Sequence, residues 1–222
     1  MPIILDAEGT VTNPQGFQVG TATCGIKSSG NLDLMLLHST QSCTAAGMFT
    51  TNQVVGAPVT VNRKTLTSNS TNIRAIVANS GIANACTGNQ GLNNAIKMQD
   101  ITSKSLSCDP NQVLVLSTGV IGIQLPMKKI DKGIRTASSN LSHNSGYNGA
   151  EAIMTTDTNP KYCALEVKLP TGTFTIGGIA KGAGMVHPNM ATMLACITTD
   201  AKVPDSILRS SLITAVNKSF NR

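Results

Sequence analysis

The sequence is poor in charged and in aromatic side chains. Charged residues make up 13% of the 222 residues, against about 25% in a typical soluble domain. There is no Trp, and there are only two Tyr and four Phe, whereas glycine occurs 20 times. This composition favours closely packed sheets of small, β-branched residues, and it indicates that large surfaces are covered by other polypeptide. The length suits one or two domains with a substantial core.

Further absences exclude several classes of protein. The net charge of +6 comes from single, scattered Lys and Arg, and no basic run alternates with aromatics, so we expect no nucleic-acid partner. No apolar run approaches the ~20 residues that cross a membrane. The first residues lack the basic and apolar regions of a secretory signal. We therefore expect a soluble, cytoplasmic protein with no membrane partner.

The cysteines carry no metal-binding or disulfide pattern. None forms a CxxC pair or has a His at ligand spacing, which argues against structural zinc and favours a reducing compartment. We expect no metal and no organic cofactor. The six residues are Cys24, Cys43, Cys86, Cys108, Cys163 and Cys196.

Short β-type runs separated by Gly, Asn and Ser dominate the chain. Helical spacing appears in three places: 89–101, 127–141 after Pro126, and from Asp205 onward. Strands gathered in runs, with few helices between them, predict α+β layers rather than alternating βαβ units. The expected strands cover residues 18–26, 32–38, 44–49, 57–62, 73–78, 113–117, 163–169, 174–179 and 193–198.

The most informative stretch runs from Lys181 to Leu194. A threonine hydroxyl is a poor nucleophile without a base, and a chain cut just before the threonine frees an α-amine that can serve as that base. This amine titrates near pH ~8 and can accept a proton in the cell. We therefore hypothesise self-cleavage at Ala191–Thr192, with Thr192 as nucleophile. The alternative is a threonine that simply begins a buried strand.

Two residues of the same loop carry weaker signals. Lys181 could hold a carboxylate or phosphate as a point charge, or it could be a solvated loop lysine. His187 precedes a proline in the loop, and we assign it no role.

A second candidate follows the expected strand at 113–117. Thr118 and Gly119 offer a hydroxyl and an unobstructed backbone N–H, and two donors converging on one point can stabilise an oxyanion. A plain glycine turn is the alternative.

The polar segment around Asp157 is a third candidate. Hydroxyls such as that of Thr155 surround this carboxylate ahead of Pro160 and could hydrogen-bond an amino-acid substrate. Alternatively, Asp157 caps its own backbone in a polar loop. The small-residue segment 79–88 is best interpreted as scaffold, and Cys86 is a less favoured nucleophile because no His lies near it in sequence.

Taken in order, these motifs resemble the ornithine acetyltransferase family, the bifunctional glutamate N-acetyltransferases of arginine biosynthesis. The resemblance extends over nearly the whole chain, and the motifs that carry it are Gly25-Ile26-Lys27, the segments 45–52, 57–59, 79–81 and 83–88, Ser117-Thr118-Gly119 with 120–122, Met154-Thr155-Thr156-Asp157-Thr158, and Lys181-Gly182-Ala183-Gly184-Met185 leading to Ala191-Thr192-Met193-Leu194.

The resemblance implies a precursor that cuts itself at Ala191–Thr192. Residues 1–191 would form the α chain, and 192–222 would be the start of a truncated β chain, because family members are roughly twice this length. It also implies an α2β2 assembly and a layered α/β/β/α fold with mainly antiparallel and mixed sheets, incomplete in this chain.

The implied reaction is acetyl transfer from N-acetylornithine to glutamate through an acetyl-threonine intermediate. Thr192 would be the nucleophile, Thr118 and Gly119 the oxyanion donors, and Thr155, Lys181 and Thr192 the substrate-binding residues. Some members also accept acetyl-CoA as donor. Two other functions stay open: a related self-cleaving aminopeptidase-like hydrolase, and an inactive fragment that acts only as a binding domain.

Overall fold

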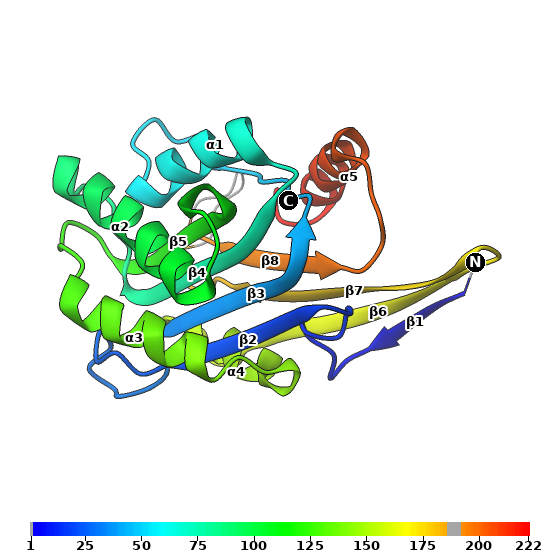
Figure 1. Ribbon diagram of the computed structural model, residues 1–222, viewed down its shortest axis with the longest axis horizontal. Coiled ribbons are helices and arrows are strands. Elements are labelled where there is room, and N and C mark those ends of the chain that lie inside the picture. Colours follow the sequence, from blue (N-terminus) through cyan, green and yellow to red (C-terminus); the bar gives the residue numbers. More distant parts are fainter. Residues whose placement is uncertain (1, 186–191) are drawn as a thin grey trace.

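The computed structural model describes residues 2–185 and 192–222. Figure 1 shows two stacked sheets, with helices covering the outer face of one of them. The first sheet has the order β2-β3-β4-β5, and the second has the order β1-β6-β7-β8. The strands are β1 Ile3–Asp6, β2 Phe17–Ala22, β3 Leu34–Cys43, β4 Ile73–Ile82, β5 Val113–Val120, β6 Lys161–Leu169, β7 Gly172–Lys181 and β8 Leu194–Thr199; the helices are α1 Ala57–Asn69, α2 Gly88–Leu106, α3 Met127–Ser139, α4 Gly146–Ala152 and α5 Asp205–Lys218, with 3-10 turns at Pro110–Gln112 and His143–Ser145.

The two sheets differ in strand direction. Every pair in the second sheet is antiparallel, as are β2–β3 and β3–β4. In contrast, β4 and β5 run parallel, and α2 forms the crossover that such a pair needs. The α+β class and the mainly antiparallel, mixed sheets predicted from the sequence are therefore confirmed, with one βαβ unit placed inside them.

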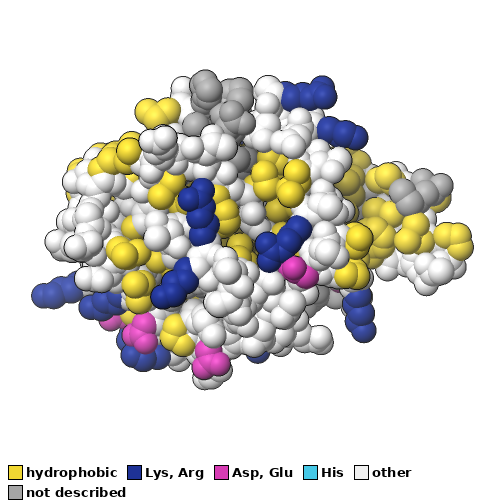
Figure 2. Space-filling view, turned by 90° about the horizontal axis from the view of Figure 1, so that it is seen from above, with side chains coloured by type: hydrophobic (Ala, Val, Ile, Leu, Met, Phe, Trp, Pro, Cys, Tyr) yellow, Lys and Arg dark blue, Asp and Glu magenta, His cyan; other side chains and the backbone are white. Residues whose placement is uncertain are grey.

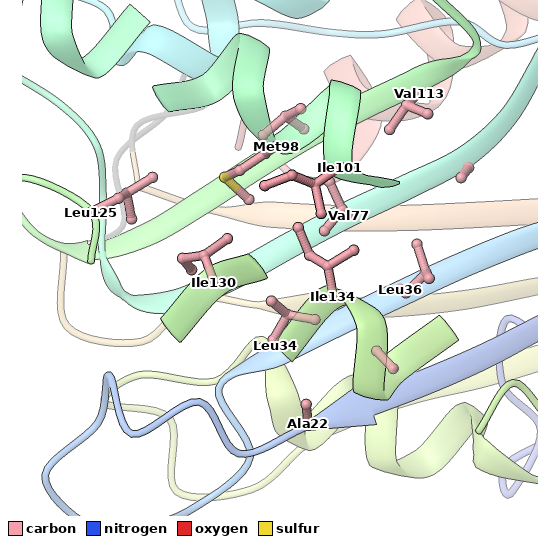
Figure 3. Packing of buried hydrophobic residues seen from close by; sticks show 13 residues of the cluster. Ala22, Leu34, Leu36, Val77, Met98, Ile101, Val113, Leu125, Ile130 and Ile134 are labelled. Carbon is pink, nitrogen blue, oxygen red and sulfur yellow. The ribbon is translucent and has the colours of Figure 1, made fainter. Parts of the chain in front are cut away.

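The first half of β3 is buried on both faces of the sheet, which explains its unbroken apolar run from Leu34 to Leu37. Leu34 and Leu36 point toward the helices, whereas Met35 and Leu37 point toward the second sheet, as expected from the period of two along a strand. Figure 3 shows the helix side, where the side chains of α2 and α3 meet those of the strands. The labelled members are Ala22, Leu34, Leu36, Val77, Met98, Ile101, Val113, Leu125, Ile130 and Ile134.

The second cluster joins the two sheets. It brings Val19, Met35 and Ala78 of the first sheet against Ile179 and Cys196 of the second. Beside this cluster, the backbone of β7 lies close to the segment that contains Thr10. A Cβ at Gly177 would lie 2.1 Å from the backbone oxygen of Thr10, so only glycine fits.

Two of the expected strands are wrong. Residues 57–62 begin α1, because Pro58 lies in its first turn, where the lost N–H has no helical partner anyway. The helical spacing was hidden because the buried face of α1 includes the polar residues Asn62 and Thr65. Asn62 exchanges hydrogen bonds with the backbone N–H and C=O of Val115, which satisfies its amide. Residues 44–49 are irregular and pair with none of the strands that the structure describes.

The surface carries dispersed charge. Figure 2 shows Lys and Arg side chains spread over one face, with apolar side chains among them. Exposed apolar residues occur on β1, β8 and α5, including Leu5, Ile197 and Ile207. Within the described residues, no helix combines the length and the apolar character needed to span a bilayer.

Candidate active site

The parallel strands β4 and β5 each have a glycine as their next-to-last residue, and these two glycines lie against each other. Gly119 is paired with Gly81, and both have positive φ, +132° and +102°. A Cβ at Gly119 would lie 2.2 Å from the carbonyl carbon of Gly81. Glycine is therefore required here by steric contact as well as by φ, whereas the sequence alone left an ordinary glycine turn open. Thr118, one residue earlier, is buried.

Lys181 joins this strand end to the Thr155 loop. Its Nζ donates to Oγ1 of Thr118 at 3.1 Å and to Oγ1 of Thr155 at 2.6 Å. An ammonium group has donors only, so both hydroxyls accept from it, and each keeps its own proton for another acceptor. Three predicted site residues from β5, β7 and the loop after α4 are thus brought together, although they are up to 63 positions apart in sequence.

Lys181 is the last residue of β7 and is only 3% exposed, so the alternative of a solvated loop lysine is wrong. Burial lowers the pKa of Lys181, while the charge of Asp157 raises this pKa and that of Lys161 lowers it. In the part of the chain that the structure describes, Lys181 belongs to none of the ion pairs within 4.0 Å. A buried cation without a paired carboxylate is suited to bind one from a substrate.

Asp157 is not free to bind a substrate. Its side chain is 0% exposed, and its two oxygens accept from Lys161 Nζ at 2.6 Å, Gly182 N at 2.8 Å and Thr155 N at 3.3 Å. The backbone-capping interpretation is therefore the one that fits, with a long-range bond to Gly182 added to it.

Thr192 lies two residues before β8, whose first residue, Leu194, pairs with Lys181. Two extended residues span at most about 7 Å, so Thr192 lies at the same end of the sheet as Lys181. It is exposed, and its φ is +56°, a conformation that costs a β-branched residue roughly 1–3 kcal/mol. Ala191 and His187 lie outside the described residues.

Comparison with known proteins identifies the group to which this architecture belongs. The model of the ArgJ family matches residues 18–222. This chain belongs to the ArgJ family. Among its relatives, the arginine biosynthesis bifunctional protein ArgJ of Dehalococcoides mccartyi (strain CBDB1) is 49% identical over 216 residues, covering 96% of this chain and 52% of that protein. The protein of the same name from Thermotoga neapolitana is 50% identical over 208 residues, covering 94% and 52%.

Solved structures agree with this assignment. The ornithine acetyltransferase of Mycobacterium tuberculosis, solved in complex with ornithine, has a TM-score of 0.78 and 37% identity, covering 89% of this chain and all of that one. An L-aminopeptidase D-Ala-esterase/amidase of Ochrobactrum anthropi, described as a variant of the Ntn hydrolase fold, has a TM-score of 0.58 at 13% identity, covering 100% of this chain and 71% of that one. The second likeness concerns the fold alone.

The chain spans about half the length of the curated relatives that it matches. Relatives from Heterostelium pallidum and Dictyostelium discoideum carry the word mitochondrial in their names, so the cytoplasmic location stays a prediction.

Other motifs of this ArgJ-family chain are built into the scaffold. Ser117 Oγ donates to Asn79 Oδ1, Asn79 Nδ2 donates to the carbonyl of Ile82, and Ser80 Oγ donates to that of Ala152. These hydrogen bonds satisfy the side chains of Asn79 and Ser80 within the protein, which supports the interpretation of the segment as scaffold.

Sequence reasoning missed one supporting residue, Asp33. Its buried carboxylate accepts from the backbone N–H groups of Cys24, Ile26 and Lys27 at 2.6, 2.6 and 3.2 Å. This loop places Ile26 against Gly81, where an added Cβ would lie 2.8 Å from Ile26 Cγ2. The available signal was a single carboxylate beside the apolar run of β3.

The cysteines of the described protein are all free, and Cys86 and Cys163 are exposed. Among residues 2–185 and 192–222, no group of three or more His, Cys, Asp or Glu could hold a metal ion.

Proposed function

We propose that this chain carries the nucleophile and the oxyanion site of an enzyme that moves an acetyl group from N-acetylornithine to glutamate. The observation that carries the proposal is the Lys181 ammonium, which bridges the hydroxyls of Thr118 and Thr155 inside the protein. Membership of the ArgJ family supports it. The solved ornithine acetyltransferase of Mycobacterium tuberculosis, which was crystallised with ornithine, supports the proposed substrate class.

The first step is self-cleavage. The Thr192 hydroxyl attacks the carbonyl carbon of Ala191, the peptide bond breaks with its nitrogen leaving as the amine of Thr192, and water then hydrolyses the resulting ester. The products are a carboxylate on Ala191 and a free α-amine on Thr192. The positive φ of Thr192 raises the energy of the uncut chain beside this bond, which favours the reaction.

The second step is acetyl transfer. The freed amine takes the hydroxyl proton as Thr192 attacks the acetyl carbonyl of N-acetylornithine, and ornithine leaves with that proton on its nitrogen. The acetyl ester of Thr192 then reacts with the amine of glutamate, which gives N-acetylglutamate and restores the hydroxyl. Two half-reactions through one covalent intermediate predict ping-pong kinetics.

Thr118 and Gly119 act on the charge that develops in each tetrahedral intermediate. Because Thr118 accepts from Lys181, its own O–H can be directed at the oxyanion, and the Lys181 charge polarises that donor further. Thr155 has the same arrangement and can donate to the substrate. The ammonium of Lys181 is suited to the α-carboxylate that N-acetylornithine and glutamate have in common.

Two extensions of the proposal concern partners. Acetyl-CoA can serve as a second acetyl donor, because attack by Thr192 on its thioester leads to the same acetyl ester. The two chains produced by cleavage are proposed to stay together as α2β2. Native mass spectrometry and initial rates with acetyl-CoA plus glutamate test these two extensions separately.

The main test uses the purified protein that contains residues 1–222. Ornithine release from N-acetylornithine is measured with and without glutamate, in the natural sequence and in Thr192→Ala. A transferase needs the acceptor for sustained release, whereas a hydrolase does not. Equal activity of Thr192→Ala would show that the nucleophile is another residue.

A further inference from the structure

The carboxylate of Asp157 links the two sides of the proposed site. Asp157 lies in the loop between α4 and β6, and its enclosed side chain accepts from the backbone N–H of Gly182, 25 residues further along the chain. Gly182 directly follows Lys181 at the end of β7. The bond therefore fixes the backbone that carries the Lys181 ammonium.

The same carboxylate also holds the backbone of the other partner of that ammonium. Its second oxygen accepts from Thr155 N at 3.3 Å, while Thr155 Oγ1 accepts from Lys181 Nζ at 2.6 Å. Asp157, Thr155 and Lys181 with Gly182 thus form a closed ring of hydrogen bonds. In such a ring, the position of the ammonium and that of the hydroxyl cannot change independently.

The charge of Asp157 is maintained by these donors. Burial raises the pKa of its carboxyl, but the hydrogen bonds from Lys161, Gly182 and Thr155 outweigh this and lower the pKa to about 2. Lys161 is half-exposed, so its ion pair is partly screened by water. The two backbone donors are the part of the arrangement that reaches the site.

We propose that Asp157 is a positioning residue for acetyl transfer, which holds Lys181 and Thr155 at the spacing at which they meet the substrate. This inference rests on the proposed function. A displacement of about 1 Å in a substrate-positioning group can cost about 100-fold in rate. Asp157→Asn replaces one acceptor oxygen by a donor, which cannot accept from a backbone N–H.

The test compares kcat/KM for acetyl transfer in three variants. Asp157→Asn is expected to lose about 10-fold or more. Asp100→Asn is the matched control, because Asp100 also pairs with a lysine four residues on, at 2.8 Å, but is exposed; it is expected to leave the rate unchanged. Lys161→Met is expected to stay within about threefold, since both backbone donors remain.

A double-mutant cycle separates positioning from a general structural effect. If the carboxylate acts through the ring, Asp157→Asn costs less activity in a Thr155→Val background than in the natural sequence, because only its bond to Gly182 still acts on Lys181. Equal losses in both backgrounds, or a loss no greater than that of Asp100→Asn, would overturn the proposal.

Hydrogen exchange on the unsubstituted protein gives a readout that does not depend on activity or on the folding of a variant. The Gly182 amide follows the last residue of β7, and Asp157 is its partner, so we expect exchange that is slowed at least about tenfold relative to an unprotected amide. An unprotected Gly182 amide would show that the hydrogen bond to Asp157 does not hold this backbone, and it would overturn the proposal. A protected amide in a protein without acetyl transfer would instead contradict the proposed function.

Discussion

The contact between Gly119 and Gly81 allows a quantitative prediction. In Gly119→Ala the new Cβ would lie 2.2 Å from the carbonyl carbon of Gly81, 2.4 Å from its oxygen and 2.6 Å from the nitrogen of Ile82, whereas ordinary contacts begin at 3.4 Å. All three atoms belong to the backbone, so no side chain can rotate away. The strand end must move by about 1 Å, which takes the N–H at 119 out of the 2.7–3.1 Å range in which an oxyanion donor works.

The expected loss follows from the value of one such donor. Removing a single oxyanion donor costs about 10²–10³-fold in kcat, or about 2.7–4 kcal/mol, so we expect Gly119→Ala to lose activity in that range. Steady-state acetyl transfer from N-acetylornithine to glutamate measures it, with circular dichroism and thermal unfolding to confirm the fold.

Gly122→Ala is the matched control. Gly122 also has a positive φ, +83°, but nothing lies within 4 Å of its added Cβ. It therefore bears the backbone strain of roughly 1–2 kcal/mol without the displacement, and kcat should change less than about threefold. If folded Gly119→Ala is as active as Gly122→Ala, the oxyanion assignment is refuted. Should Gly119→Ala fail to fold, Thr118→Val removes the other donor without adding bulk.

Three further predictions concern charge and burial. Lys181→Met should raise KM for N-acetylornithine by about 10–100-fold, because a hydrogen bond to a charged group is worth about 1.5–3 kcal/mol; an unchanged KM would contradict carboxylate binding. The pKa of Asp157 is depressed to about 2, so its contribution to stability is complete above the unfolded pKa of about 4 and is lost as pH falls through about 2. The free energies of unfolding of the natural protein and of Asp157→Asn, measured in urea, should therefore converge near pH 2. A difference between them that stays constant with pH would contradict the depressed pKa. Burial raises the pKa of Cys196 to about 12, so iodoacetamide at pH 8 should label the exposed Cys86 and Cys163 but not Cys196 in the native protein; equal labelling would contradict the assigned burial.

Much of the fold could be predicted from the sequence because its strands are apolar on both faces or alternate regularly. The helix at Met127–Ser139 begins directly after Pro126, as its spacing predicted. Helix α1 was missed because Asn62 and Thr65, which face the core, look like surface residues until their partners on other elements are known. Hydrogen bonds between a buried polar side chain and a distant part of the chain cannot be predicted from the local spacing of apolar residues.

The residues that meet around Lys181 were each singled out from the sequence, but the contacts between them could not be predicted. Local motifs pointed to Thr118, Thr155 and Lys181 one by one, whereas their meeting at a single ammonium depends on the pairing of strands far apart in sequence. The role of Asp33 and the bond between Asp157 and Gly182 were hidden for the same reason: each carboxylate binds backbone N–H groups in another segment of the chain, which carry no sequence signature.

In the proposed mechanism, cleavage at Ala191–Thr192 makes Thr192 an N-terminal nucleophile. Mass spectrometry of the purified protein that contains residues 1–222, before and after incubation with N-acetylornithine, tests it most directly. We predict a new N-terminus at Thr192 and, after incubation, a fragment beginning at Thr192 that is heavier by one acetyl group. An intact Ala191–Thr192 bond in a protein that still transfers acetyl groups would show that Thr192 does not act as an N-terminal nucleophile.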